Sequence, residues 1–418
     1  ACAAAWSAGT EPGTLQTLYE EARQLAQTPE GRAEAMARYE RIIEIHQANA
    51  KTYEAALRQL AQCYSDAEQV EEGARFFVGL AQKMWSAQRA DPLREILNQF
   101  RLKYPEQVNQ VIAEIQSAQP GARPTPPVPA KDLAQAIVQR DDPLLREKGL
   151  ERLAAMLAEP ASVADKQQGL ATLRSALTAK FDRAPWRALV LPLLASEDAQ
   201  VRALALQCLP GLEATADDLP LVIPLAQDPS AQVRQRVGGA LIQLGKGEHP
   251  EMVVPALMQL LRDEDSKVVE ETIRSMWGQY TAPDFDALLI ELSYKPEYHH
   301  NVIYFGLSTM RSKSPAVCRR LSEVLAEPDW NDSGRAAWGL SYGVTEEAKA
   351  LVEEGLLAAL PEETHEYTRK NELRALTNVA TERSRPYLTS VAESEMETDE
   401  ARETARRILA ALDGRQGR

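Results

Sequence analysis

Residues 228–262 read DPSAQVRQRVGGALIQLGKGEHPEMVVPALMQLLR, and this stretch carries the strongest architectural signal in the chain. It is rich in residues that favour helix, and Gly245, Lys246 and Gly247 form a helix stop followed by a turn. Similar units recur along the chain, with equivalent positions at steps of 32, 35, 32, 34, 34 and 33 residues. These positions are Arg202, Arg234, Val269, Asn301, Arg335, Arg369 and Arg402.

A helical unit that recurs every ~33 residues is typical of a solenoid. The residue six places after each equivalent position is mostly small, and the next is mostly large and apolar. A single helix pair cannot bury its apolar face, so neighbouring pairs must stack. The sequence therefore predicts an all-α superhelix with a long concave surface lined by the second helix of each pair.

The repeated unit resembles a HEAT repeat, and in particular its bacterial, phycobilisome-lyase-like variant. That family has a proline in the first helix, an aspartate eight residues later at the turn, and an arginine six residues further on. Pro220, Asp228 and Arg234 match all three positions. The spacing of acid and arginine recurs without the proline in two other pairs, Asp329 with Arg335 and Glu363 with Arg369.

The resemblance implies a structural role for these pairs. The acid either caps the second helix or binds the arginine one turn into it, and stacked repeats then align the pairs into a ladder. An exposed pair of this kind is worth ~0–1 kcal/mol. Val269 and Asn301 occupy the arginine position in two repeats, so the ladder is expected to be interrupted there.

A second helical region precedes the repeats. Six helices are predicted, near 15–27, 30–48, 52–65, 70–87, 92–103 and 106–116. The third and fourth resemble a tetratricopeptide repeat, because Ala61 and Ala74 would let two helices approach while Tyr64 and Phe77 fill the space between them. A generic helical hairpin domain is the alternative.

Five prolines between 119 and 130 predict a semi-rigid linker. We therefore expect an N-terminal segment at 1–13, a tetratricopeptide-like domain at 14–118, a linker at 119–131 and a HEAT-like solenoid at 132–415.

The formal net charge of −14 disfavours nucleic acid and anionic lipid as partners. No apolar run is long enough to span a membrane. The segment 1–9 has two interpretations, the remnant of a secretory or lipoprotein signal with Cys2 as a candidate lipid anchor, or an expression scar. Extracytoplasmic and cytoplasmic locations both stay open.

No catalytic motif stands out, and we predict no enzyme activity, metal or cofactor. The four cysteines form no CxxC pair, and no two of the five histidines have i, i+4 spacing. His299 and His300 are adjacent, so they are expected to lie on different helix faces and to chelate poorly. His365-Glu366 falls short of the several His-Glu pairs that hold the di-iron centre of HEAT-type hydroxylases.

The leading hypothesis is a non-catalytic scaffold that binds a protein partner on the concave face. The alternatives are a repeat-type enzyme or accessory subunit, such as a bilin-lyase-like protein, and a structural lipoprotein. Ten of the 24 aromatic residues fall within 277–342, and two interpretations of them stay open, core and binding surface. Four residues are predicted to contact the partner: Arg274, Trp277, Lys370 and Arg374.

Overall fold

The computed structural model describes residues 12–45, 50–84, 90–118, 128–138, 142–177 and 182–416. Helices and short helical turns form all of the regular structure in these ranges, apart from one isolated bridge between Lys313 and Val344. The predicted all-α class is confirmed. The candidate anchor Cys2, the segment 1–11 and the linker residues 119–127 lie outside the described residues.

The chain divides into two compact units, Ala1–Asp182 and Arg183–Arg418. The first unit contains α1 (Pro12–Leu25), α2 (Arg32–Ile45), α3 (Ala50–Asp66), α4 (Val70–Met84), α5 (Ala90–Lys103), α6 (Pro105–Ala118), α7 (Ala130–Val138), α8 (Pro143–Leu157) and α9 (Val163–Ala176). The first six of these lie close to the predicted ranges. Since α7, α8 and α9 group with the first unit, the assignment of 132–182 to the solenoid stays a prediction.

The packing of α3 against α4 follows the small and large residues that the sequence pointed out. Tyr64 and Phe77 are buried and meet edge to face, with ring centroids 6.2 Å apart. Ala74 is fully buried, and a Cβ on Gly73 would come within 2.8 Å of the Tyr64 ring. Small residues thus allow the close approach of the two helices, as expected. The tetratricopeptide assignment itself stays a prediction.

The second unit contains α10 (Ala184–Val190), α11 (Ala199–Cys208), α12 (Leu219–Val222), α13 (Ala231–Gly245), α14 (Pro250–Leu260), α15 (Ser266–Ser275), α16 (Pro283–Ser293), α17 (Pro296–Asn301), α18 (Pro315–Val324), α19 (Trp330–Leu340), α20 (Lys349–Ala359), α21 (Glu366–Val379), α22 (Arg385–Glu393) and α23 (Asp399–Gln416). A π-helical turn, Val302–Gly306, continues α17. Proline shapes some first helices: after four residues α12 gives way to a 3-10 turn at Ile223–Gln227, which contains Pro224.

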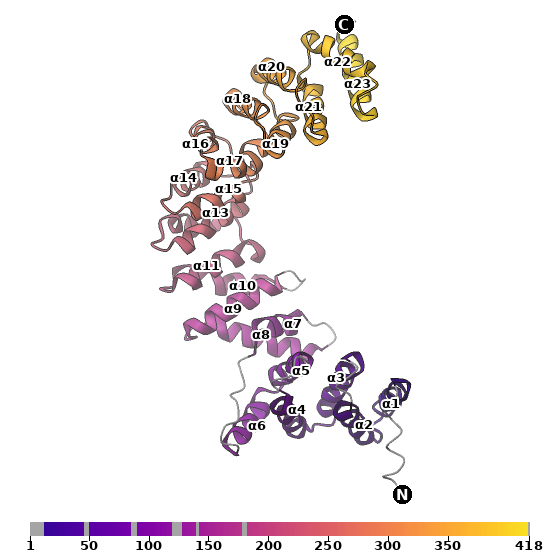
Figure 1. Cartoon of the computed structure of the whole chain (residues 1–418). Helices are drawn as coiled ribbons and strands as arrows, with labels where there is room; N and C mark the ends of the chain where they lie inside the picture. The colour runs from indigo at the N-terminus through magenta and orange to yellow at the C-terminus, as the bar shows by residue number, and fades with distance from the viewer. Residues whose placement is uncertain are drawn as a thin grey trace. The chain divides into compact units, whose positions relative to one another are not determined.

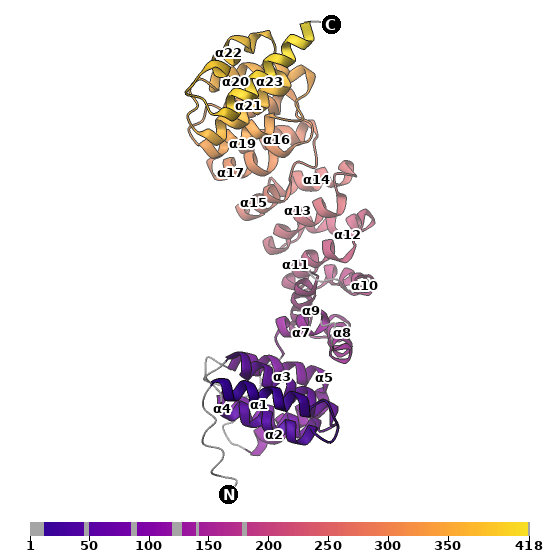
Figure 2. The same cartoon turned by 90° about the vertical axis from the view of Figure 1, so that its right-hand side faces the viewer.

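The helices of the second unit form two layers. The first helices α14, α16, α18 and α20 contact one another in sequence, and the second helices α11, α13, α15, α17 with its π turn, α19, α21 and α23 form the other layer. Figure 2 turns α19, α21 and α23 of the second layer toward the viewer. Apolar side chains such as Leu321, Leu340 and Leu376 are fully buried. Each pair thus shelters its apolar face against the next one.

No helix within the described ranges is both long and apolar enough to cross a membrane.

Candidate functional site

The arginine ladder joins successive repeats. Arg202 donates from Nε and Nη2 to the two carboxylate oxygens of Asp228, both at 2.7 Å. Arg234 binds Asp263 in the same way, at 2.6 and 2.9 Å. Of the two alternatives predicted for Asp228, pairing of its side chain with Arg234 of the same repeat is therefore not formed.

Two edges of the guanidinium explain this arrangement. Arg234 donates from Nη1 to the main-chain carbonyl of Asp228 at 2.8 Å, which leaves its Nε–Nη2 edge for the next repeat. The Asp228 carboxylate also accepts the Ser230 main-chain N–H at 2.8 Å, beside the start of α13. Burial acts to raise the pKa of Asp263, but hydrogen bonds from Arg234 and from the Asp265 main chain hold it below its ordinary value.

In the later repeats, only some of the ladder residues pair with the next repeat in this way. Arg369 forms a bidentate pair with Glu397 of the next repeat, and Glu363 accepts the His365 main-chain N–H at 2.5 Å. Asp329 caps α19 by accepting from the main-chain N–H of Asn331 at 2.8 Å. Glu363 and Asp329 therefore hold the starts of their own second helices, and neither carboxylate pairs with the arginine six residues on.

Arg335 breaks the ladder. Its guanidinium turns toward the preceding repeat, where Nε and Nη2 donate to the Tyr304 carbonyl at 3.2 and 3.1 Å. The guanidinium carbon lies 4.3 Å from the ring centroid of Tyr304 and 3.9 Å from that of Trp338. The predicted pair of Asp329 with Arg335 is therefore not formed, because two aromatic rings and a carbonyl hold the arginine elsewhere.

An aromatic strip runs across this region of the second-helix layer. We define it as Trp277, Tyr304, Phe305, Trp338 and Tyr342. Trp277 meets Phe305 edge to face at 5.3 Å, Phe305 meets Tyr304 at 4.8 Å, and Trp338 meets Tyr342 at 5.0 Å. Trp277 is 54% exposed and the other four rings are partly buried. The strip thus presents ring surface to solvent while its rings support one another.

The four predicted contact residues do not form one cluster. Arg274 lies one turn before Trp277 and forms an ion pair with Glu270 at 2.7 Å. Lys370 lies on α21, pairs with Glu400 at 2.7 Å, and lines a cavity of about 380 Å³ between α21 and α23. Arg374 is exposed on α21. Since the layer order is α15, α17, α19 and α21, two helices separate the two pairs.

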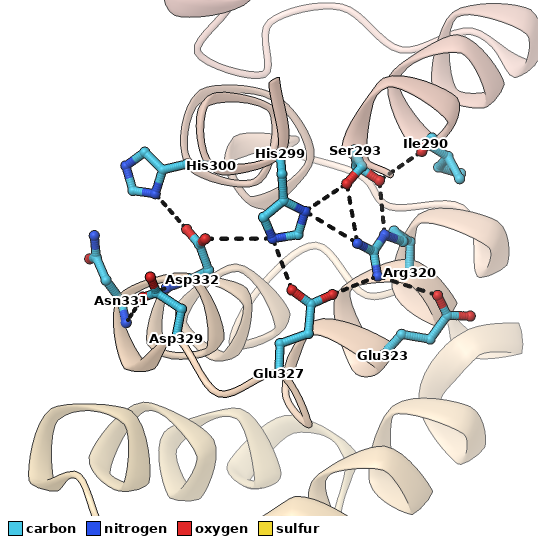
Figure 3. Close-up of polar contacts among 10 residues, drawn as sticks. All are labelled: Ile290, Ser293, His299, His300, Arg320, Glu323, Glu327, Asp329, Asn331 and Asp332. Atoms are coloured by element: carbon cyan, nitrogen blue, oxygen red, sulfur yellow. Dashed lines mark hydrogen bonds and ion pairs between the residues drawn. The ribbon is translucent and has the colours of Figure 1, made fainter. Parts of the chain in front are cut away.

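A polar cluster between neighbouring repeats was missed by sequence reasoning (Figure 3). His299 Nε2 lies 2.9 Å from Glu327 Oε2 and 3.5 Å from Asp332 Oδ2. His300 Nδ1 lies 2.6 Å from the other oxygen of Asp332. The adjacent histidines were expected to lie on different helix faces, and the structure adds that each reaches one oxygen of the same Asp332 carboxylate. Even so, no group of three or more His, Cys, Asp or Glu residues in the described ranges is arranged to hold a metal ion.

The His299 ring makes contacts through both of its nitrogens. Its Nδ1 lies 2.6 Å from the Ser293 carbonyl oxygen and 3.4 Å from Arg320 Nη2, and its Nε2 faces carboxylates. Arg320 completes the cluster by donating to Ser293 Oγ at 2.8 Å and to Glu327 at 3.0 Å (Figure 3).

This cluster has a structural role. It joins α16 and α17 to α18 and α19 in the repeat where Asn301 replaces the ladder arginine. In the sequence, the absence of arginine at position 301 was the signal that these repeats must be joined by contacts other than the arginine ladder.

Stacked helix pairs with inter-repeat arginine links define the second unit as a helical-repeat array. Residues 187–277 match the family model described as HEAT repeats. The predicted resemblance to HEAT repeats is therefore confirmed over this segment.

Several solved structures match this chain at low similarity. A mutant of Kap121p has a TM-score of 0.49 at 12% identity, covering 91% of this chain and 46% of its own. YibA of E. coli has a TM-score of 0.45 at 15% identity, and the match covers 70% of this chain and 98% of YibA. The complex of CpcE and CpcF of phycocyanin lyase from Nostoc has a TM-score of 0.31 at 16% identity, and the match covers 58% of this chain and 98% of that chain. All three TM-scores are low, so they carry no conclusion about function. No curated protein matches this chain.

Proposed function

We propose that the chain is a non-catalytic scaffold that binds a protein partner through the aromatic strip of its HEAT-type array. The observation that carries the proposal is the half-exposed Trp277, packed edge to face on Phe305. Exposed aromatic rings held rigidly by their neighbours are typical anchors of protein interfaces, because they bury much area and lose little conformational entropy.

The surrounding charges also favour a protein partner. Arg274 lies one turn before Trp277, and Arg335 lies against the rings of Tyr304 and Trp338, in a chain whose formal net charge is −14. Arginine and tryptophan are the residue types most often found at interface hot spots. The partner is expected to cover the rings and to find cations at the edge of its footprint.

Affinity capture from the native host, followed by mass spectrometry, tests this proposal with matched variants. Trp277→Ala combined with Arg274→Ala removes the most exposed ring and its neighbouring cation. Leu221→Ala removes a similarly exposed apolar side chain from α12, on the first-helix side. Loss of a hot spot weakens binding by about 30-fold, so the double variant should release a partner that Leu221→Ala retains. Equal capture by both variants, with unfolding unchanged, would reject the strip as a binding site.

A further inference from the structure

Arg335 occupies the ladder position but makes no ion pair with any residue in the described ranges. In the equivalent positions, Arg202, Arg234 and Arg369 each bind a carboxylate of the next repeat. The acid that precedes α21, Glu363, accepts the His365 main-chain N–H instead. Arg335 is thus a ladder arginine whose counter-charge the array does not supply.

The guanidinium of Arg335 is held in a fixed orientation. Its Nε–Nη2 edge is occupied by the Tyr304 carbonyl and by Ser308 Oγ at 3.1 Å. The rings of Tyr304 and Trp338 restrict its movement. Nη1 makes no hydrogen bond to the described part of the chain and is not a fully buried atom, so its N–H groups remain to be paired with a ligand.

This environment favours an incoming anion. Burial lowers the pKa of Arg335, and the nearby hydroxyls of Tyr304, Tyr342 and Tyr367 oppose that effect in part. The side chain still stays charged, because arginine loses its proton far above neutral pH. A partly desolvated cation without a counter-ion gains most from a carboxylate, which accepts two parallel N–H bonds from one guanidinium edge.

We infer that the outer Nη1–Nη2 edge of Arg335 binds a side-chain carboxylate of the protein partner, with apolar partner residues beside it covering the aromatic strip. The ligand class is a single Asp or Glu flanked by apolar residues. A long acidic tract fits poorly, since the chain itself carries −14 and would repel it. This inference rests on the proposed function and adds the chemistry that the site recognises.

The adjacent π-helical turn supports a functional role for this place. Val302–Gly306 supplies Tyr304 and Phe305 to the strip. π-helical turns are uncommon in proteins, and many of those that occur lie at functional sites.

Selection of a random peptide library on the full-length chain tests the inference. The wild type, Arg335→Gln, Arg335→Lys and the control Arg319→Gln are compared. Arg319 is exposed on α18 in the other layer, so its variant changes the net charge equally. Peptides enriched on the wild type should carry one Asp or Glu among apolar residues. A charged hydrogen-bonded pair predicts about 10- to 100-fold weaker binding after Arg335→Gln or after amidation of that acid.

The outcomes separate the two proposals. Arg335→Lys should bind less tightly than the wild type because it keeps the charge but loses the planar fork. Trp277-dependent binding of peptides without an acid, or equal affinity for the acid and amide forms, would overturn the inference and leave the proposed function intact. If no peptide is enriched on the wild type, both are overturned. Arg319→Gln should match the wild type throughout.

Discussion

Glu372 offers a quantitative test of the packing in the array. This residue of α21 is fully buried, and neither of its carboxylate oxygens has a hydrogen-bond partner in the described structure. Burial, with a smaller contribution from Glu363, raises its pKa from 4.5 to about 8, while Arg369 opposes the change. The side chain is therefore a neutral acid in the folded protein at pH 7.

The sign and size of the pH effect follow from this difference. Glu372 ionises near pH 4.5 in the unfolded chain and near pH 8 in the folded protein. Its contribution to the free energy of unfolding is therefore fully favourable below pH 4.5 and is lost as pH rises toward 8. The two values differ by about 3.5, and each unit is worth about 1.4 kcal/mol. The free energy of unfolding should therefore fall by up to about 5 kcal/mol across this range on account of Glu372 alone.

Glu372→Gln removes the ionisable group and should abolish this part of the pH dependence. The assay is urea unfolding followed by circular dichroism at pH 5 and pH 8. Between pH 5 and pH 8, the free energy of unfolding of the wild type should fall by a few kcal/mol more than that of the variant. An unchanged pH dependence would refute the reasoning.

Glu353→Gln is the matched control. Glu353 is also buried, but its carboxylate accepts hydrogen bonds from Thr381 and Ser384. Because an amide can replace these contacts only in part, this variant should lose stability at both pH values, by about 1–3 kcal/mol.

Three further changes test other parts of the structure. Burial lowers the pKa of Lys313 to about 8, so the free energy of unfolding should rise by up to about 3 kcal/mol between pH 8 and 10.5, and Lys313→Met should remove that rise in urea unfolding. A double-mutant cycle of Arg234→Ala and Asp263→Asn should give a coupling of about 1–3 kcal/mol, which vanishes as pH falls through the lowered pKa of Asp263; additive effects at pH 7 would contradict the ladder. Gly278→Ala should lower the free energy of unfolding by at least about 2 kcal/mol, since φ is +59° and a Cβ would lie 2.2 Å from the Thr309 carbonyl carbon. Its control, Gly79→Ala, places a Cβ in open space and should leave the free energy of unfolding unchanged or raise it.

The period and the apolar pattern predicted the array well, because helix stacking follows from local spacing. The regular steps from Arg202 to Arg402 reflect one structural unit repeated. The acid and arginine positions were also visible, but the partner of each was not. Pairing depends on which edge of the guanidinium faces the next repeat, and this is set by three-dimensional stacking rather than by sequence spacing.

The site itself was harder to predict for the same reason. Trp277 was identified as an exposed ring, but its contact with Phe305 crosses from one repeat to the next. His299 and His300 were expected to lie on different helix faces, but the sequence did not show that Asp332 of the next repeat lies within reach of both. Such convergence involves residues about 30 positions apart, and a helical wheel of one element contains no information about it.

Photo-crosslinking in the native host tests the central claim most directly. A benzophenone amino acid is placed at Phe305 in the strip and, separately, at Leu221 on the first-helix side. Irradiation should yield a discrete protein adduct from position 305 and none of that mass from position 221. No adduct at 305, or the same adduct from both positions, would contradict the assignment of the aromatic strip as the partner-binding surface.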